Sequence, residues 1–341
     1  MDAQHRDGAR DRGTPGTMSV LINLHSHLEG RVRPSTATEL APALGLDDPP
    51  EGWATAIALD APGTLTQYLV RVAATYPFFR SAEAVRRIAR EAVIDAAASG
   101  QSHLELRFGP ATHADDASGI DEIVRAACEG LRDATAITGI SAGIVLAALR
   151  HHDPETNELV ADAAARAAGS GVVGFDLAGD ELLYPALEPH TGAFAIARAA
   201  GLGITCHAAE AGPASAARQA VELLGASRIG HGAHIVEDPE VLAWCADNDV
   251  VVEICPTSNV FTGAIARLDQ HPEATFRAAG VPLVLGDDNP MQTGSDLATE
   301  RTVLQRAFGW QDDDLAALDR VSVAAAFLEP ADRERLRSML S

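Results

Sequence analysis

Short runs of β-branched and apolar residues alternate with longer Ala-, Leu-, Arg- and Glu-rich stretches along most of the chain. This alternation is typical of βα units built around a parallel sheet. Each run enters a loop followed by a plausible helix. The runs are Val20–His27, His103–Phe108, Ile140–Leu149, Val172–Leu177, Gly203–His207, Arg228–Gly232, Val250–Cys255 and Pro282–Gly286. Eight strands favour a closed barrel over an open sheet, so the sequence predicts an α/β fold, a (β/α)₈ TIM barrel.

The segment between the first two runs, residues 28–102, is far longer than one crossover helix requires. Because it follows the first strand, it is expected to hang over the C-terminal ends of the strands, which carry the functional residues of such barrels. Helical spacing of apolar residues is strongest over Ala82–Ser99. We therefore expect a helical insertion after strand one, a single domain over residues 19–341, and a disordered tail over the polar residues 1–18.

Composition excludes several classes of function. The formal net charge of −22 would repel phosphate backbones, which argues against nucleic acid and for a small-molecule partner. All 26 basic residues are arginines, so Schiff-base enzymes and Walker-type phosphate loops, which need a lysine amine, are excluded. The four cysteines lack C-x-x-C spacing, and no apolar run is long enough to span a bilayer. We expect a cytoplasmic protein without a membrane partner, and homo-oligomerisation stays open.

Histidines end three of the predicted strands. His25 and His27 end the first strand and point to the same side, because side chains alternate along a strand. His207 ends the fifth run, with Glu210 three residues beyond it, and His231 ends the sixth between two glycines. A His-x-His pair alone is a weak metal signal. Its place at the C-terminal end of a barrel strand strengthens the interpretation.

The eighth run ends in two adjacent carboxylates, Asp287 and Asp288. Such a pair usually marks only a turn or a helix cap. Here it joins three other strand ends that carry imidazoles. Three neutral imidazoles and one carboxylate suit Zn²⁺ and leave a coordination position for water.

The ordered set of motifs resembles the adenosine deaminase family, which includes adenine deaminases and related purine deaminases. The motifs are His-x-His-Leu-x-Gly, His-Ala-x-Glu, Arg-Ile-Gly-His-Gly, and Asp-Asp followed shortly by Pro. Matching stretches also occur at residues 175–181 and 253–259, and the resemblance covers roughly Leu21 to Thr299. As an ordered set these motifs are far more specific than any one of them alone.

The resemblance implies hydrolytic deamination of a 6-aminopurine to the 6-oxopurine and ammonia, with one Zn²⁺ per chain. The implied metal ligands are His25, His27, His207 and Asp287. His231 would orient the metal-bound water or accept its proton, and Glu210 would protonate purine N1 so that C6 accepts hydroxide. Asp288 would hydrogen-bond to N7, and the backbone of Gly179 would meet N3.

Three departures from the family pattern leave the substrate open. Glu29 stands where adenosine deaminases usually carry the Asp that contacts the ribose 5′-hydroxyl, and it is predicted to bind substrate beyond the base. Ala209 replaces the usual Gly before Glu210, and Asn289 separates Asp288 from the proline. Candidates are adenosine, adenine, or a specialised adenine nucleoside such as aminodeoxyfutalosine or a nucleoside-antibiotic intermediate.

Two other classes of protein share part of this pattern. Binuclear amidohydrolases share the barrel and the His-x-His pair but usually bridge two metals with a carboxylated lysine, which this chain lacks. A catalytically silent purine-binding relative would have lost a metal ligand or the acid, and neither is lost. Other polar residues receive structural interpretations. His113, His151 and His152 could line the substrate pocket but are interpreted as solvated loop histidines, and Glu105 with Arg107 is interpreted as an ion pair.

Overall fold

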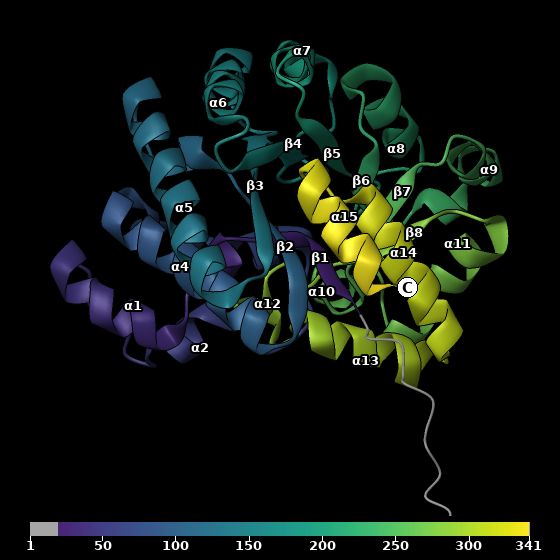
Figure 1. Ribbon diagram of the computed structural model, residues 1–341, viewed down its shortest axis with the longest axis horizontal. Helices are drawn as coiled ribbons and strands as arrows, with labels where there is room; N and C mark the ends of the chain where they lie inside the picture. The colour runs from purple at the N-terminus through teal and green to yellow at the C-terminus, as the bar shows by residue number, and fades with distance from the viewer. Residues whose placement is uncertain (1–19, 341) are drawn as a thin grey trace, which may run out of the picture.

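A computed structural model describes residues 20–340, and the tail predicted over residues 1–18 lies outside these described residues. Eight parallel strands follow one another in sequential order around a nearly closed barrel (Figure 1). The strands are β1 (Leu21–His27), β2 (Gln101–Phe108), β3 (Ser141–Leu149), β4 (Val172–Ala178), β5 (Gly203–Ala208), β6 (Arg228–His231), β7 (Val251–Ile254) and β8 (Leu283–Leu285). The (β/α)₈ prediction is confirmed, and each strand end falls within two residues of its predicted position.

Helices ring the strands and separate them along the chain (Figure 1). From the helix that precedes β2 onward, the helices are α4 (Ala82–Ala98), α5 (Ala117–Thr138), α6 (Pro154–Ala167), α7 (Thr191–Ala199), α8 (Ser215–Gln219), α9 (Pro239–Asp247), α10 (Pro256–Phe261), α11 (Glu273–Ala279), α12 (Pro290–Thr293), α13 (Leu297–Phe308), α14 (Asp312–Ala325) and α15 (Pro330–Met339). Helix α4 begins after Ser81, whose Oγ accepts the N–H of Ala84, and its apolar stripe is buried as the sequence predicts.

The helical insertion after the first strand is confirmed. It contains α1 (Pro34–Leu40), α2 (Trp53–Ile57) and α3 (Leu65–Ala73). Thr64 and Gln67 form a reciprocal capping box that fixes the start of α3. The apolar face of this amphipathic helix is turned inward, and its residues Leu65, Tyr68 and Val72 are buried. Helix α3 thereby becomes a cover for the C-terminal end of the barrel.

Contacts between the chain after β8 and β1 close the barrel. Asp288 and Ser26 form a parallel bridge. The N–H of His27 donates to the carbonyl of Asp288 at 2.7 Å, and the N–H of Asp288 donates to the carbonyl of His25 at 2.9 Å. These two bonds fix the backbone of Asp288 between the two histidines of β1.

Buried ion pairs cross the interior of the barrel. Arg228 of β6 donates to Glu105 of β2 and, at 2.6 Å, to Glu253 of β7. Arg107 of β2 donates to Asp176 of β4 and to Glu253. The predicted pairing of Glu105 with Arg107 is therefore wrong, because alternate residues of β2 reach across the barrel to partners on other strands instead of to each other.

Phe327, between α14 and α15, packs at the N-terminal ends of the strands. Its ring lies against the Cα positions of Gly174 and Gly203, where a methyl group would clash, and the Arg228 guanidinium lies 3.6 Å from its centroid. This end of the barrel is thus filled.

Among the described residues, no helix is both long and apolar enough to cross a membrane.

Candidate active site

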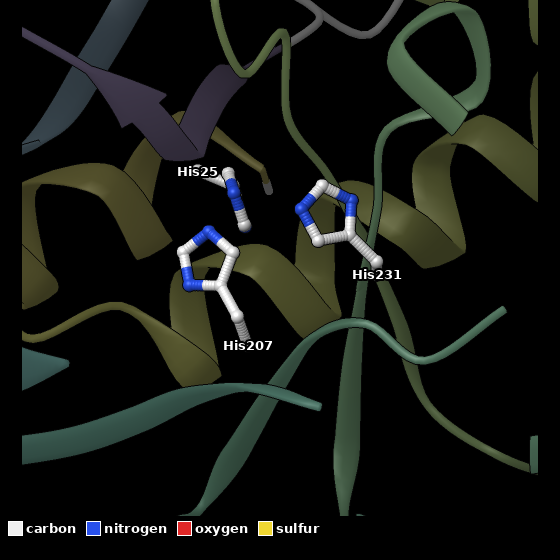
Figure 2. Close-up of side chains that lie close together, drawn as sticks. All are labelled: His25, His207 and His231. Carbon is white, nitrogen blue, oxygen red and sulfur yellow. The ribbon is translucent and has the colours of Figure 1, made fainter. Parts of the chain in front are cut away.

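Four imidazoles from three strands face one space at the C-terminal end of the barrel. His25 and His27 come from β1, His207 from β5 and His231 from β6. Figure 2 shows the rings of His25, His207 and His231 turned toward one another. One ring nitrogen of each lies within 4.8 Å of the others. The Nε2 atoms of His27 and His207 are 3.1 Å apart. The structure therefore brings together every histidine that the sequence singled out for the site.

Carboxylates behind the cluster orient two of the rings. Nδ1 of His25 lies 2.7 Å from Glu253, and Nδ1 of His207 lies 2.9 Å from Asp176. This arrangement turns both Nε2 atoms toward the shared space. Nε2 of His25 is buried and has no hydrogen-bond partner. A buried orphan nitrogen among converging imidazoles fits a divalent cation, and carboxylates on the far ring nitrogen are the usual support for histidine ligands.

The carboxylate that joins the histidines is Asp288. Its Oδ1 lies 3.3 Å from Nε2 of His27 and 3.7 Å from Nε2 of His25, and these three side chains form a second group able to hold a metal ion. The carboxylate of Asp287 instead binds Arg31 at 2.6 Å. The prediction of Asp287 as the metal ligand therefore requires correction by one residue.

The backbone explains this one-residue difference. The strand β8 ends at Leu285, and Asp288 adopts a left-handed conformation with φ of 56°. Strand alternation no longer applies there, so the side chain turns back toward the histidines. Its Oδ2 is held by the hydroxyls of Ser258 and of Tyr68, the latter from the covering helix α3.

Backbone strain gathers at this end of the barrel. Four described residues other than glycine have positive φ, and three of them, Ala209, His231 and Asp288, lie in or beside the cluster. Such conformations are disfavoured for side chains with a Cβ and persist where the surroundings impose them, most often at functional sites.

Protonation states suit metal binding. Burial lowers the pKa of His25 and of His231, and it lowers the pKa of His27 to about 4. These three rings are therefore neutral at pH 7. Burial opposes ionisation of Asp288, but interactions with the rings of His27, His231 and His25 and the hydrogen bond from Ser258 hold its pKa below the usual range. For His207 burial is outweighed by Asp176, which raises the pKa. Neutral imidazoles and an ionised carboxylate are the forms that bind metals.

Glu210 has the environment of a proton donor. It is buried, its Oε1 has no hydrogen-bond partner, and its Oε2 lies 3.8 Å from Nε2 of His231. Burial raises its pKa, with a further contribution from Asp288 opposed by His231. The loop that carries it is fixed by Glu181, whose carboxylate accepts four consecutive backbone N–H groups from residues 209–212.

A pocket opens directly onto this cluster. Its lining includes Gly179 at the end of β4, Glu29, Asn289 and the inward face of α3. Oε1 of Glu29 accepts the N–H of Gly109 at 3.2 Å and lies 3.3 Å from Nε2 of His113, while Oε2 is buried without a partner. His113 is itself buried, so its interpretation as a solvated histidine is wrong. His151 is exposed but also lines the pocket.

The sequence matches the family model for adenosine deaminase over residues 21–341. The chain belongs to the adenosine deaminase family. It is 32% identical to an adenosine deaminase of Enterococcus faecalis, over 94% of this chain and 95% of that relative. The family resemblance seen in the sequence is thus confirmed.

Solved structures of related proteins are similar to this chain over most of its length. A Zn-bound amidohydrolase from Burkholderia ambifaria is 25% identical with a TM-score of 0.84, covering 94% of this chain and 89% of its own. Arabidopsis ADAL complexed with IMP is 26% identical with a TM-score of 0.81, covering 94% of this chain and 95% of its own. The chain is a hydrolase that acts on carbon–nitrogen bonds of adenine-type substrates, and its family is of the metal-dependent amidohydrolase type.

The sequence did not identify the residues that support this site. Asp176 and Glu181 lie in the matching stretch 175–181, and Glu253 begins the stretch 253–259, so family motifs marked their positions without showing their roles. The role of each depends on a partner far away in the chain. Glu253 is 228 residues from His25, and Asp176 and Arg107 come from separate strands.

Proposed function

We propose that the chain catalyses zinc-dependent hydrolytic deamination of a 6-aminopurine to the 6-oxopurine and ammonia. The observation that carries this proposal is the convergence of four imidazoles and Asp288 on one space beside a buried, protonatable Glu210. The substrate class comprises adenosine, adenine and modified adenine nucleosides. The retained ligand set and the retained acid support an enzyme over a silent purine-binding relative.

His25, His27, His207 and Asp288 are proposed to hold one zinc ion. The ligand types suit zinc, and a solved relative contains it. When bound, zinc lowers the pKa of a water molecule toward neutrality and so supplies hydroxide at pH 7. The fourth imidazole, His231, then stands beside the ligand set as the group that orients the water and accepts its proton.

His231 is suited to accept a proton because its ring is neutral and a hydrogen bond fixes the position of one ring nitrogen. Its Nδ1 lies 3.0 Å from the side-chain amide nitrogen of Asn259, and its Nε2 faces Glu210. Because burial lowers its pKa, the ring is neutral at pH 7. In the tautomer with its hydrogen on Nδ1, facing the side-chain amide of Asn259, Nε2 is free to accept a proton.

Glu210 is proposed to protonate N1 of the purine. Protonation weakens the aromatic character of the ring, so that C6 accepts the hydroxide and the amino group leaves as ammonia. A carboxyl group must hold its proton at neutral pH to act in this way, and the burial that raises the pKa of Glu210 favours that state.

The remaining substrate contacts follow from the pocket lining. Gly179 is proposed to meet N3 and Glu29 to bind what lies beyond the base, through its free Oε2. With Asp288 used as a ligand, the hydrogen bond to N7 is assigned to Asn289. Its side-chain nitrogen donates to Asp288 at 2.7 Å and retains a second hydrogen for the base.

An ammonia-release assay over adenine, adenosine and 5′-modified adenosines tests this function. We expect turnover of at least one of them, and Glu210→Gln to keep the metal while losing kcat by several orders of magnitude. Asp162→Asn, on the outer surface of α6, is the matched control and keeps wild-type turnover. Near-normal turnover in the Glu210 variant removes this residue from the mechanism.

A further inference from the structure

The insertion between β1 and β2 supplies a partner to each of the two adjacent carboxylates after β8. Arg31, near its start, donates to Asp287 at 2.6 Å. Tyr68, on α3, donates its hydroxyl hydrogen to Oδ2 of Asp288 at 3.0 Å. The guanidinium compensates the charge of Asp287, whereas the phenol is neutral and Asp288 has no arginine partner among the described residues. Asp288 is therefore the carboxylate whose charge is left for a cation.

The two oxygens of Asp288 have different surroundings. Oδ2 accepts hydrogen bonds from the hydroxyls of Tyr68 and of Ser258 in α10. Oδ1 lies 3.3 Å from Nε2 of His27 and accepts the side-chain amide of Asn289. The two hydroxyls fix the rotation of the carboxylate, so that Oδ1 stays on the side of the histidines. Hydrogen bonds of this kind are the usual support for a carboxylate that binds a metal.

The folding of α3 brings the phenol to this carboxylate. Leu65, Tyr68 and Val72 are spaced so that a helix places them on one face, and this face is buried against the barrel. Tyr68 is only 2% exposed. A buried phenol hydroxyl needs a hydrogen-bond acceptor. Here that acceptor is a proposed metal ligand from a segment more than 200 residues further along the chain.

Backbone hydrogen bonds tie the insertion to the segments that follow β7 and β8. The N–H of Gly63, just before α3, donates to the carbonyl of Phe261 in α10 at 3.0 Å. The N–H of Leu59 donates to the carbonyl of Gln292 in α12 at 2.8 Å. The same two segments carry the serine and the aspartate that meet the phenol. The contact between α3 and the carboxylate is therefore held by backbone on both sides.

We propose that Tyr68 is a positioning residue for the metal ligand Asp288, so that the insertion completes the metal site from outside the barrel. The inference rests on the proposed function, because it takes Asp288 to hold the zinc ion. It gives the insertion a role besides covering the pocket. Because linked equilibria are reciprocal, a phenol that strengthens zinc binding also makes bound zinc stabilise the position of α3.

Competition with a chelator of known affinity tests the role of the hydroxyl. Tyr68→Phe keeps the ring and removes only the hydroxyl. We expect zinc affinity to fall about tenfold, at the lower end of the range for lost support of a ligand, because Ser258 still binds Oδ2.

Tyr76→Phe is the matched control. Tyr76 lines the same pocket, but its hydroxyl makes no hydrogen bond within residues 20–340. The same chemical change should therefore leave zinc affinity at the wild-type value. Equal zinc affinities in Tyr68→Phe and Tyr76→Phe overturn the proposal.

A double-mutant cycle shows whether the phenol acts through Asp288. In the Asp288→Asn background the phenol has no ligand to position. Adding Tyr68→Phe there should lower the remaining zinc affinity by less than about twofold. A further tenfold loss in this background would show that Tyr68 affects the site through general packing, and it would overturn the proposal.

Hydrogen exchange tests the reciprocal effect on α3. In wild type, zinc should slow exchange of the backbone N–H groups of residues 69–73 by up to about tenfold, because the bound ion stabilises the seated helix. In Tyr68→Phe, zinc should have little effect on these groups. An equal effect of zinc in both proteins contradicts the proposed coupling.

These measurements use zinc without substrate, so they separate the inference from the function on which it rests. If zinc binds but no 6-aminopurine is deaminated, the proposed function fails, while a tenfold effect of Tyr68→Phe on zinc affinity still supports the inference. A wild-type chain that binds no zinc overturns the inference.

Discussion

Ala209 shows how single residues at this site carry strain. It follows β5 with φ of 52°, in the left-handed region that a Cβ disfavours by about 1–2 kcal/mol. The family pattern has glycine here, which adopts this conformation freely. The methyl group of Ala209 is buried next to Glu210, so the chain tolerates strain beside the proposed acid.

Ala209→Gly should relieve this strain. We expect the free energy of unfolding of the Ala209→Gly variant to exceed that of the Ala208→Gly variant by at least about 1 kcal/mol. Ala208 is equally buried in β5 but has no positive φ, so a glycine there relieves no strain. Urea denaturation of both variants measures the difference. Equal destabilisation by the two glycines would show that Ala209 is not strained.

Glu29 is predicted to control what is accepted beyond the base. One carboxylate oxygen is fixed by the N–H of Gly109 and by His113, while the other is free. Glu29→Asp withdraws the free oxygen by one methylene, so the ratio of kcat/KM for adenosine to that for adenine should change by at least about tenfold. An unchanged substrate profile would refute this role.

At the scale of elements, Arg107 connects the strands that support the proposed metal ligands. From β2 it donates to Asp176 of β4 and Glu253 of β7, which orient His207 and His25. Arg107 is fully buried. Burial lowers its pKa, but the two carboxylates outweigh this effect and hold the pKa above the ordinary value for arginine. One guanidinium thus sets the position of both supporting carboxylates.

Removal of this guanidinium should loosen the metal site. We expect Arg107→Met to lower zinc affinity about 10–100-fold, as is typical when the support of a histidine ligand is lost. Competition with a chelator of known affinity measures the change, and Arg107→Lys, which keeps a charge, should retain part of the affinity. Arg86→Met removes an exposed ion pair with Asp133 and should leave the affinity unchanged. Equal zinc affinity in Arg107→Met and wild type contradicts the role.

Elements proved more predictable from the sequence than side-chain directions. The strands could be predicted because each is a short buried run beside a polar loop. The helical insertion could be predicted because residues 28–102 are far more than a single crossover helix needs. The sequence predicts Asp287 at the histidine cluster where the structure places Asp288, because alternation predicts directions only within a strand and β8 ends before both residues. The ion pairs of Arg107 were missed because contacts across a barrel depend on register, which local patterns do not encode.

For the whole molecule, the buried acid Glu300 makes stability depend on pH. Glu300 is buried, and burial raises its pKa to about 7, opposed by hydrogen bonds from Ser295 and from Thr257. The folded chain therefore keeps this proton where the unfolded chain has lost it. The stabilising contribution is complete below the unfolded pKa of 4.5 and disappears as pH rises through about 7.

Glu300→Gln should remove this dependence, because the amide mimics the protonated acid and can bond to the same partners. We expect the variant to match wild type near pH 4.5 and to exceed its free energy of unfolding by up to about 3 kcal/mol at pH 8. Denaturant titrations at both pH values provide the measurement. A difference that is the same at both pH values would show that Glu300 does not titrate in this range.

The most direct measurement of the central claim is the zinc content of two neighbouring variants. Asp287→Asn and Asp288→Asn change one atom each on adjacent residues, so general effects on folding are matched. We expect about one zinc per chain in wild type and in Asp287→Asn, and loss of zinc from Asp288→Asn after dialysis against a mild chelator. Full zinc retention in Asp288→Asn, with loss from Asp287→Asn, would contradict the proposed metal site.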